Sequence, residues 1–228
     1  MIVRNRKVRT LVATAAICFP DKLRRLIHRR LLGYNIHPTA KIGRAFIDVD
    51  RLEMSERASI GSLTVIRGCE DVIMREEAVI GGLVWVNAVR KDKGYFAGQD
   101  RHCALIMDRG SAITYLHFLD CCDTIEFGAC SVLAGYGSQL LTHNVDMVLM
   151  KLRAQPVRIG HHTMIGTSSV ILPGVTIPAC SVVSAGSVMH RWSIDDGPHL
   201  YTGVPAVARR KLKPELLPCL TRTRAHIW

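Results

Sequence analysis

Residues 159–194 read IGHHTM, IGTSSV, ILPGVT, IPACSV, VSAGSV, MHRWSI, a run of six blocks of six residues each. Each block starts with an aliphatic or Met residue, and its fifth place is small or β-branched. A helix repeats about every 3.6 residues and a half-buried strand every 2, so neither gives this period. The period predicts a parallel β-helix, in which each block is a short strand plus a turn and three blocks close one triangular coil. The first places are Ile159, Ile165, Ile171, Ile177, Val183 and Met189, and the fifth places are Thr163, Ser169, Val175, Ser181, Ser187 and Ser193.

The same register occurs earlier in the chain, so we expect the β-helix to span residues 34–202. The earlier matches are residues 36–47, 54–65, 74–85 and 107–130. The phase breaks twice, and we expect loops to leave the column there, at 87–106 and 137–158. The aliphatic first residues should fill the column, and each contributes about 1.5–3 kcal/mol when fully buried.

The two ends of the chain are basic and are the candidates to cover the open ends of the column. Residues 1–33 hold nine Lys/Arg and one acid, and the segment 203–228 is also basic, with a short helical stretch expected in it. Pro20 suits the start of a helix, in which Leu23, Leu26, Ile27 and Leu31 share one face. This amphipathic helix either contacts an anionic membrane surface or caps the column with a solvated outer face, and the two alternatives are compatible.

Composition excludes several classes of protein. The 228 residues are 48% hydrophobic and 21% charged, which excludes a disordered chain, and no apolar run reaches the ~20 residues of a membrane span. The net charge of +11 sits at the two ends rather than on a folded face with interleaved aromatics, so we expect no nucleic-acid partner. None of the eight Cys forms a CxxC pair, which favours a reduced, cytoplasmic protein.

The C-terminal half resembles a known family. Residues 156–189, PVRIGHHTMIGTSSVILPGVTIPACSVVSAGSVM, followed by GVPAVARR at 203–210, resemble the hexapeptide-repeat acyltransferases. The closest branch holds the galactoside, maltose and xenobiotic O-acetyltransferases and the exopolysaccharide acetyltransferases. The resemblance implies an all-β, left-handed parallel β-helix, a homotrimer with active sites between subunits, acetyl-CoA as acyl donor and no metal.

The resemblance also implies a catalytic histidine at the mouth of the second loop, which here is His143 in GSQLLTHNVDM. Acetyl transfer to a hydroxyl needs a general base, and neutral imidazole suits that task near pH 7. Polar residues near the acceptor are implied as well. We therefore expect Asp120, His117 and Asp146 to bind substrate, although His117 could instead be a hydrogen-bonded, half-buried histidine and Asp146 a turn carboxylate.

The acetyl-CoA site carries over at four positions. Thr167 and Ala185 match the small residues along which the family lays the pantetheine arm, and they lie 18 residues, one full coil, apart. Arg191 keeps a positive charge where the family has Lys, and Arg210 fits its position for the 3′-phosphate. Three departures are His190 where the family has Thr, Met164 in place of a usual Trp and Pro178 in place of a common Gly.

We therefore expect an acetyltransferase that acts on a hydroxyl of a saccharide, for example a glycan or polysaccharide precursor. Two alternatives stay open, an N-acyltransferase on an amino sugar and a non-catalytic β-helix assembly module. A γ-type carbonic anhydrase is excluded, because it needs two His ligands five residues apart and no two His here have that spacing. The expected location is the cytoplasm, and the membrane alternative adds peripheral contact with the inner face of the membrane.

Overall fold

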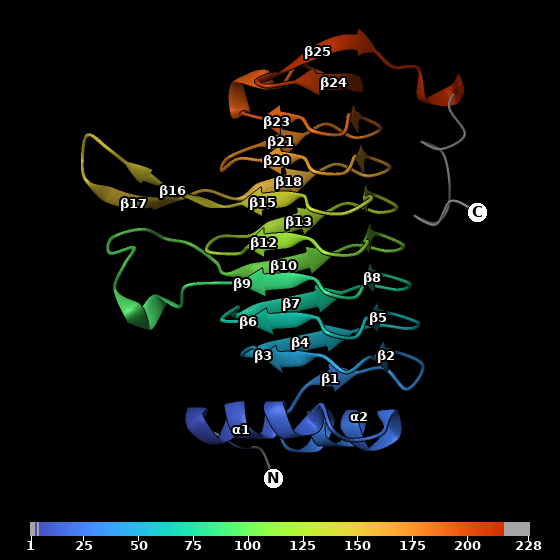
Figure 1. Ribbon diagram of the computed structural model, residues 1–228, viewed down its shortest axis with the longest axis vertical. Helices are drawn as coiled ribbons and strands as arrows, with labels where there is room; N and C mark the ends of the chain where they lie inside the picture. Colours follow the sequence, from blue (N-terminus) through green and yellow to red (C-terminus); the bar gives the residue numbers. More distant parts are fainter. Residues whose placement is uncertain (1–2, 4, 217–228) are drawn as a thin grey trace.

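The six-residue period becomes a three-sided column of stacked coils (Figure 1). The first residue of each block is buried inside the column. Ile165, Ile171 and Met189 are fully buried, and the fifth-place residues Ser169 and Ser187 are buried beside them at the corners. The structure, a computed structural model, describes residues 3 and 5–216. The predicted all-β fold of stacked parallel coils is confirmed.

Three parallel sheets form the sides of the column, and successive strands of the chain pass from sheet A to sheet B to sheet C. Sheet A contains β1 (Asn35–Ile36), β4 (Arg51–Met54), β7 (Asp71–Met74), β10 (Ala104–Met107), β13 (Ile125–Phe127), β18 (Val157–Ile159) and β21 (Thr176–Ile177). Sheet B contains β2 (Lys41–Ile42), β5 (Ser59–Ile60), β8 (Val79–Ile80), β11 (Ala112–Ile113), β14 (Val132–Leu133), β19 (Met164–Ile165), β22 (Val182–Val183), β24 (His199–Gly203) and β25 (Ala206–Lys211). Sheet C contains β3 (Phe46–Asp48), β6 (Val65–Arg67), β9 (Trp85–Asn87), β12 (Phe118–Asp120), β15 (Gln139–Leu141), β20 (Val170–Ile171) and β23 (Val188–Met189).

Close stacking of the coils explains the glycines of the repeat. Gly160 and Gly166 follow the inward aliphatic residues and lie directly against the next coil. A Cβ placed on Gly160 would lie 2.3 Å from the backbone nitrogen of Ala179, a distance that real Cβ atoms essentially never show. Glycine is therefore required where one corner passes beneath another.

The first coil has no preceding coil to pair with. It bonds to the following coil, as His37 N does to Met54 O at 2.8 Å and Lys41 N to Ala58 O at 2.9 Å. Carbonyls that face the N-terminal end are therefore left without a strand partner. Two helices, α1 (Arg6–Ala16) and α2 (Asp21–Arg30), lie across that end (Figure 1).

The helix pair differs from expectation in which face it turns to the column. The buried residues of α2 are Arg24 and His28, whereas Leu23 and Leu26 are exposed. The basic side is inward because guanidinium groups supply donors to the unpaired carbonyls, as Arg24 Nη1 does to Ile42 O at 3.2 Å. The expectation of a helix start at Pro20 agrees with the structure, and α1 precedes it as a second helix.

The other end and the two phase breaks are equally well defined. The antiparallel pair β24–β25 covers the C-terminal end, followed by the short 3-10 turn η3 (Pro214–Leu216). Both excursions leave the corner between sheets C and A. The first runs between β9 and β10 and includes η1 (Lys91–Lys93), and the second is the hairpin β16 (His143–Asp146) and β17 (Lys151–Ala154), which projects sideways (Figure 1). A further 3-10 turn, η2 (Arg191–Ser193), follows β23.

No helix within the described part of the chain is long and apolar enough to cross a membrane. No disulfide joins any two of the seven cysteines within the described residues, and Cys219 lies outside them. Five of the seven are buried, where they pack as small apolar side chains.

Candidate active site

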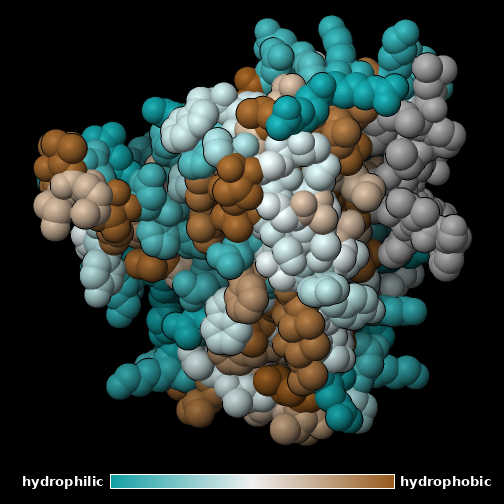
Figure 2. All heavy atoms as spheres, turned by 45° about the horizontal axis from the view of Figure 1, so that its top comes forward, coloured by the Kyte–Doolittle hydropathy of each residue, from teal (hydrophilic) through white to brown (hydrophobic). Residues whose placement is uncertain are grey.

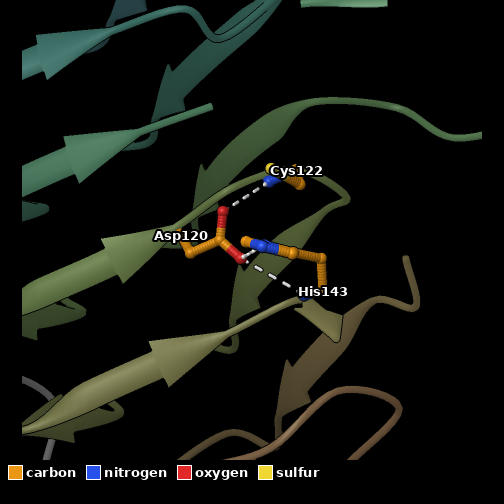
Figure 3. A group of neighbouring side chains, drawn as sticks. All are labelled: Asp120, Cys122 and His143. Carbon is orange, nitrogen blue, oxygen red and sulfur yellow. Dashed lines mark hydrogen bonds and ion pairs between the residues drawn. The ribbon is translucent and has the colours of Figure 1, made fainter. Parts of the chain in front are cut away.

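His143 lies where the chain leaves the column. It is the first residue of β16, which follows β15 at the corner between sheets C and A. Its side chain is 36% exposed. Its backbone N–H donates to Asp120 Oδ2 at 3.2 Å, and its Nδ1 is hydrogen-bonded to the same oxygen (Figure 3). The residue is thus fixed at both backbone and ring while one edge stays accessible.

Asp120 ends β12, one coil before His143, and its carboxylate holds the corner together. Besides the two bonds from His143, Oδ2 accepts from Thr142 N at 3.2 Å and Oδ1 accepts from Cys122 N at 3.3 Å (Figure 3). Its side chain is only 14% exposed. All these donors belong to the chain itself, and two of them belong to His143, so the carboxylate fixes the orientation of that residue.

Electrostatics set the proton arrangement of the pair. Burial alone would raise the pKa of Asp120, but the hydrogen bonds from His143 and Cys122 outweigh it and leave that pKa below its usual value. The hydrogen bond to Asp120 raises the pKa of His143, and burial opposes the rise. An ionised carboxylate only accepts hydrogen bonds, so Nδ1 carries the proton and neutral His143 has its lone pair on Nε2. That is the arrangement of a general base.

The first excursion packs against the histidine. The Phe96 ring meets the His143 ring edge-on, with centroids 5.8 Å apart. The buried Arg101 guanidinium lies 4.3 Å from the Phe96 centroid and donates to Cys122 O at 2.8 Å. Gln99 ties this excursion to the hairpin, since its Nε2 donates to Leu152 O at 2.7 Å and its Oε1 accepts from Ala154 N at 2.9 Å.

Three side chains at this corner carry potential metal ligands. One ligand atom each from Asp120, Cys122 and His143 lie within 4.8 Å of one another. Burial, followed by the hydrogen bond with Asp120, raises the pKa of the Cys122 thiol, and its sulfur accepts the Val89 N–H at 3.4 Å. A protonated thiol is a weak ligand. The hydrogen bonds of Asp120 therefore explain why these three side chains lie together, and the cluster is a hydrogen-bonded His–Asp pair with Cys122 beside it.

Two residues expected to bind substrate have structural roles. His117 is fully buried; its Nε2 is 3.0 Å from Thr114 Oγ1 and its Nδ1 accepts from Ser138 N at 3.1 Å. Burial lowers its pKa to about 4, so it is neutral at pH 7. Asp146 accepts from Val148 N and Leu149 N and pairs with Arg153 at 2.8 Å, which makes it a turn carboxylate of the hairpin.

Of the four residues carried over for acetyl-CoA, only Arg191 lies at the same corner of the column as His143. Thr167 and Ala185 stack on successive coils at the corner between sheets B and C, where Gly186 N donates to Thr167 O at 2.9 Å. Arg191 is exposed in η2, at the corner between sheets C and A, in a later coil than His143. Arg210 is exposed on β25 and pairs with Leu200, at the end of β24 far from the Thr167–Ala185 edge. Within one chain the structure brings His143 together with Asp120, but not with Thr167, Ala185 or Arg210.

Exposed apolar side chains gather near the Thr167–Ala185 edge. They form a stripe along the corner between sheets B and C on the coils that precede Thr167. Phe118 pairs with Trp85 on sheet C, and Tyr136 contacts Thr167, whose Oγ1 donates to Tyr136 O at 2.7 Å. We call this set the B–C stripe; its members are Leu63, Leu83, Trp85, Tyr115, Leu116, Phe118 and Tyr136.

The sequence did not single out Phe96, Gln99, Arg101 or Cys122. Three of them lie in the first excursion, which carries no repeat and so no register from which to infer contacts. Asp120, which lies about one coil before His143 in the chain, was the one partner that the sequence indicated, and the structure places its carboxylate against the histidine ring.

Comparisons with known proteins agree with this architecture. No protein-family model matches the chain. The Bacillus subtilis (strain 168) protein named "Putative acetyltransferase YvoF" is 37% identical over 67 residues, which are 29% of this chain and 37% of that protein. The match thus spans little more than a third of the relative's length.

Solved structures resemble the whole column. The polysialic acid O-acetyltransferase OatWY superposes with a TM-score of 0.59 at 16% identity, covering 78% of this chain and 84% of that one. A mutant of AntD, an N-acyltransferase from Bacillus cereus in complex with dTDP and coenzyme A, gives a TM-score of 0.49 at 15% identity over 81% and 87% of the two chains. The superposition with OatWY confirms the predicted fold: this chain is a left-handed parallel β-helix built from hexapeptide repeats.

Proposed function

We propose that this protein transfers the acetyl group of acetyl-CoA to a hydroxyl of a saccharide, with His143 as general base. The observation that carries the proposal is the His143–Asp120 pair, which leaves a basic Nε2 accessible at the mouth of two loops. The shared fold with a polysialic acid O-acetyltransferase supports a saccharide hydroxyl as acceptor.

The chemistry follows from the ring geometry. Nε2 takes the proton of the acceptor hydroxyl as its oxygen attacks the thioester carbonyl carbon. The tetrahedral intermediate then collapses, the carbon–sulfur bond breaks, and the departing thiolate receives that proton from Nε2. The products are an acetyl ester and free coenzyme A, and the neutral imidazole is restored. A backbone N–H beside the thioester carbonyl oxygen would stabilise the oxyanion that forms there.

The acyl donor is proposed to lie along the Thr167–Ala185 edge, with Arg191 and Arg210 as phosphate partners. One chain places that edge and His143 at different corners, so we propose a homotrimer in which the edge of one copy faces the histidine of the next. The B–C stripe supports this, because a run of exposed aromatic and leucine side chains is typical of an interface. The free cysteines are consistent with a reducing, cytoplasmic location.

The test is release of free thiol from acetyl-CoA in the presence of a panel of saccharides. His143→Ala should lower turnover by about 10²–10⁴-fold, the usual contribution of a general base. The matched control is His161→Ala, since His161 is exposed at the opposite corner between sheets A and B. Near-normal turnover in His143→Ala would refute the assigned base.

Two other functions are separated by the same assay. An N-acyltransferase acting on an amino sugar would use the same base but yield an amide, which survives mild alkali, whereas an ester is hydrolysed. A non-catalytic assembly module would release no thiol with any acceptor. The absence of coenzyme A binding in a titration would also refute the proposal.

A further inference from the structure

The N-terminal helices turn three of their basic side chains toward the protein. Arg24 donates to Ile42 O and Phe19 O, and Arg25 donates to Pro38 O at 2.6 Å. Arg9 of α1 does the same, with bonds to Leu32 O at 3.1 Å and Val49 O at 3.0 Å. These guanidinium groups satisfy carbonyls at the open end of the first coil, so the inward face of the pair is committed to capping.

The outward face is correspondingly apolar. Leu26 lies two residues from both Arg24 and His28, about 200° around the helix, and is 50% exposed. On α1, Leu11 lies two residues before the fully buried Ala13 and is 69% exposed. Burying these leucines in the column would require turning the arginines away from the carbonyls they cap.

We name this surface the basal face. Its apolar members are Val8, Leu11, Phe19, Leu23 and Leu26, all exposed. Exposed basic side chains flank them, namely Lys7, Lys22, Arg29 and Arg30. No ion pair joins these four to a carboxylate within residues 3 and 5–216, and the one acid of the helix pair, Asp21, is bound to Arg25 at 3.0 Å.

We propose that the basal face docks on an anionic phospholipid bilayer. The two helices would lie in the plane of the interface, with leucines among the acyl chains and Lys/Arg at the headgroups. The column then stands on end, because both helices lie across its axis (Figure 1). The inference concerns where the protein sits and holds whether or not the proposed acetyl transfer is correct.

Charge decides between a bilayer and another copy of the chain. A second copy would present the same uncompensated cations in a symmetric contact and repel the first. The body of the protein offers no acidic counterpart either, since residues 34–208 carry 15 basic and 17 acidic residues. A negatively charged membrane surface supplies both an apolar layer and the opposite charge.

A second exposed apolar group provides the rival surface. The tip of the hairpin β16–β17 carries Met147, Val148, Leu149 and Met150, which are 74%, 90%, 54% and 74% exposed. It projects from the side of the column and shows as the hydrophobic cluster at the left of Figure 2. It has no cluster of unpaired cations like that of the basal face, so it is the matched apolar control.

The experiment is co-sedimentation of the full chain with vesicles. One set is pure phosphatidylcholine and the other contains about one third phosphatidylglycerol. We expect binding to the anionic vesicles, weakened by salt. The triple variant Leu11→Ser/Leu23→Ser/Leu26→Ser should weaken it at least about tenfold, and Lys22→Gln/Arg29→Gln/Arg30→Gln should remove its salt dependence. Circular dichroism checks that each variant is folded.

The tip variant Val148→Ser/Leu149→Ser/Met150→Ser should bind as the unchanged protein does. A positive readout is added by Leu26→Trp, whose emission should shift to the blue on anionic vesicles. Absence of binding by the unchanged protein would overturn the proposal. So would loss of binding in the tip variant alone, or a concentration-dependent association without lipid that the leucine variant abolishes, which would make the basal face a contact between protein chains.

Discussion

At the residue scale, one carboxylate performs two tasks. Asp120 accepts three backbone N–H groups, from Cys122, Thr142 and His143, and so fixes the point at which the hairpin leaves the column. The same group binds His143 Nδ1 and thereby sets which nitrogen is the base. Positioning and electronic tuning of the imidazole therefore come from the same carboxylate.

Asp120→Asn should separate these effects from folding. The amide keeps the size of the side chain but can present its nitrogen to Nδ1, which favours the wrong tautomer, and turnover should fall by about 10²-fold or more. The carboxylate raises the pKa of His143, so its loss should move the acid limb of the rate profile to lower pH. The measurement is the pH dependence of kcat/KM. Glu126→Gln, an exposed carboxylate on the neighbouring β13, should leave the limb in place, and an unmoved limb in Asp120→Asn would argue against the pairing.

At the element scale, the six-residue period predicts the strands of the column but not the conformation of the loops. The six-residue register predicts the column because inward residues such as Ile165 and Met189 must recur at fixed places to fill it, and both are buried as expected. The orientation of α2 was not predictable from its own pattern. Amphipathicity identifies two faces, but the unpaired carbonyls of the first coil, which choose between them, exist only once the coils are stacked. The contact of Phe96 with His143 is likewise a product of the loop conformation.

The side chain of Gln99 links the two excursions. Gln99 bonds the backbone of β17 through both ends of its amide, and each bond contributes about 0.5–1.5 kcal/mol. Gln99→Ala should speed hydrogen exchange in residues 91–100 and lower kcat/KM about tenfold. The acid limb set by His143 should not move. Gln139→Ala, exposed on β15, is the control, and unchanged exchange in Gln99→Ala would show that the excursions hold their places independently.

The N-terminal helix pair contains a buried histidine that makes the stability of the fold depend on pH. His28 is fully buried, stacks on Tyr34, and neither ring nitrogen finds a hydrogen-bond partner within the described chain. Burial, with the nearby Arg24 charge, lowers its pKa to about 4 from 6.5. Between these values the unfolded chain binds a proton that the folded chain excludes, so the free energy of unfolding falls as pH drops from about 6.5 to 4.

His28→Phe should therefore raise the free energy of unfolding at pH 7 by about 1 kcal/mol, since it removes an unpaired buried polar group. It should also reduce the fall in the free energy of unfolding at acid pH. Part of that fall should remain, because the pKa of His117 is lowered similarly. Urea unfolding between pH 4 and pH 8 measures both. His28→Ala, which opens a cavity, should be less stable than either form, and a destabilised Phe variant would reveal a hidden partner for the ring.

At the scale of the whole molecule, two corners of the column carry the residues of the proposed site. The corner between sheets C and A carries both excursions and His143, while the corner between sheets B and C carries the Thr167–Ala185 edge and the B–C stripe. A cyclic arrangement of copies that buries the stripe would bring these two corners together across each interface. The two corners lie on different edges of a single chain, so the proposed site depends on assembly.

Mixing two inactive variants tests that dependence directly. Ala185 is exposed on the proposed acyl-donor edge, so Ala185→Arg should block the edge without disturbing the core, and His143→Ala removes the base. Each variant alone should be inactive. In randomly mixed trimers from co-expression, about one quarter of the interfaces pair an intact histidine with an intact edge, so about one quarter of the normal turnover should return. If both groups served one reaction within a single chain, every site would carry a defect and the mixture would stay as inactive as its parents.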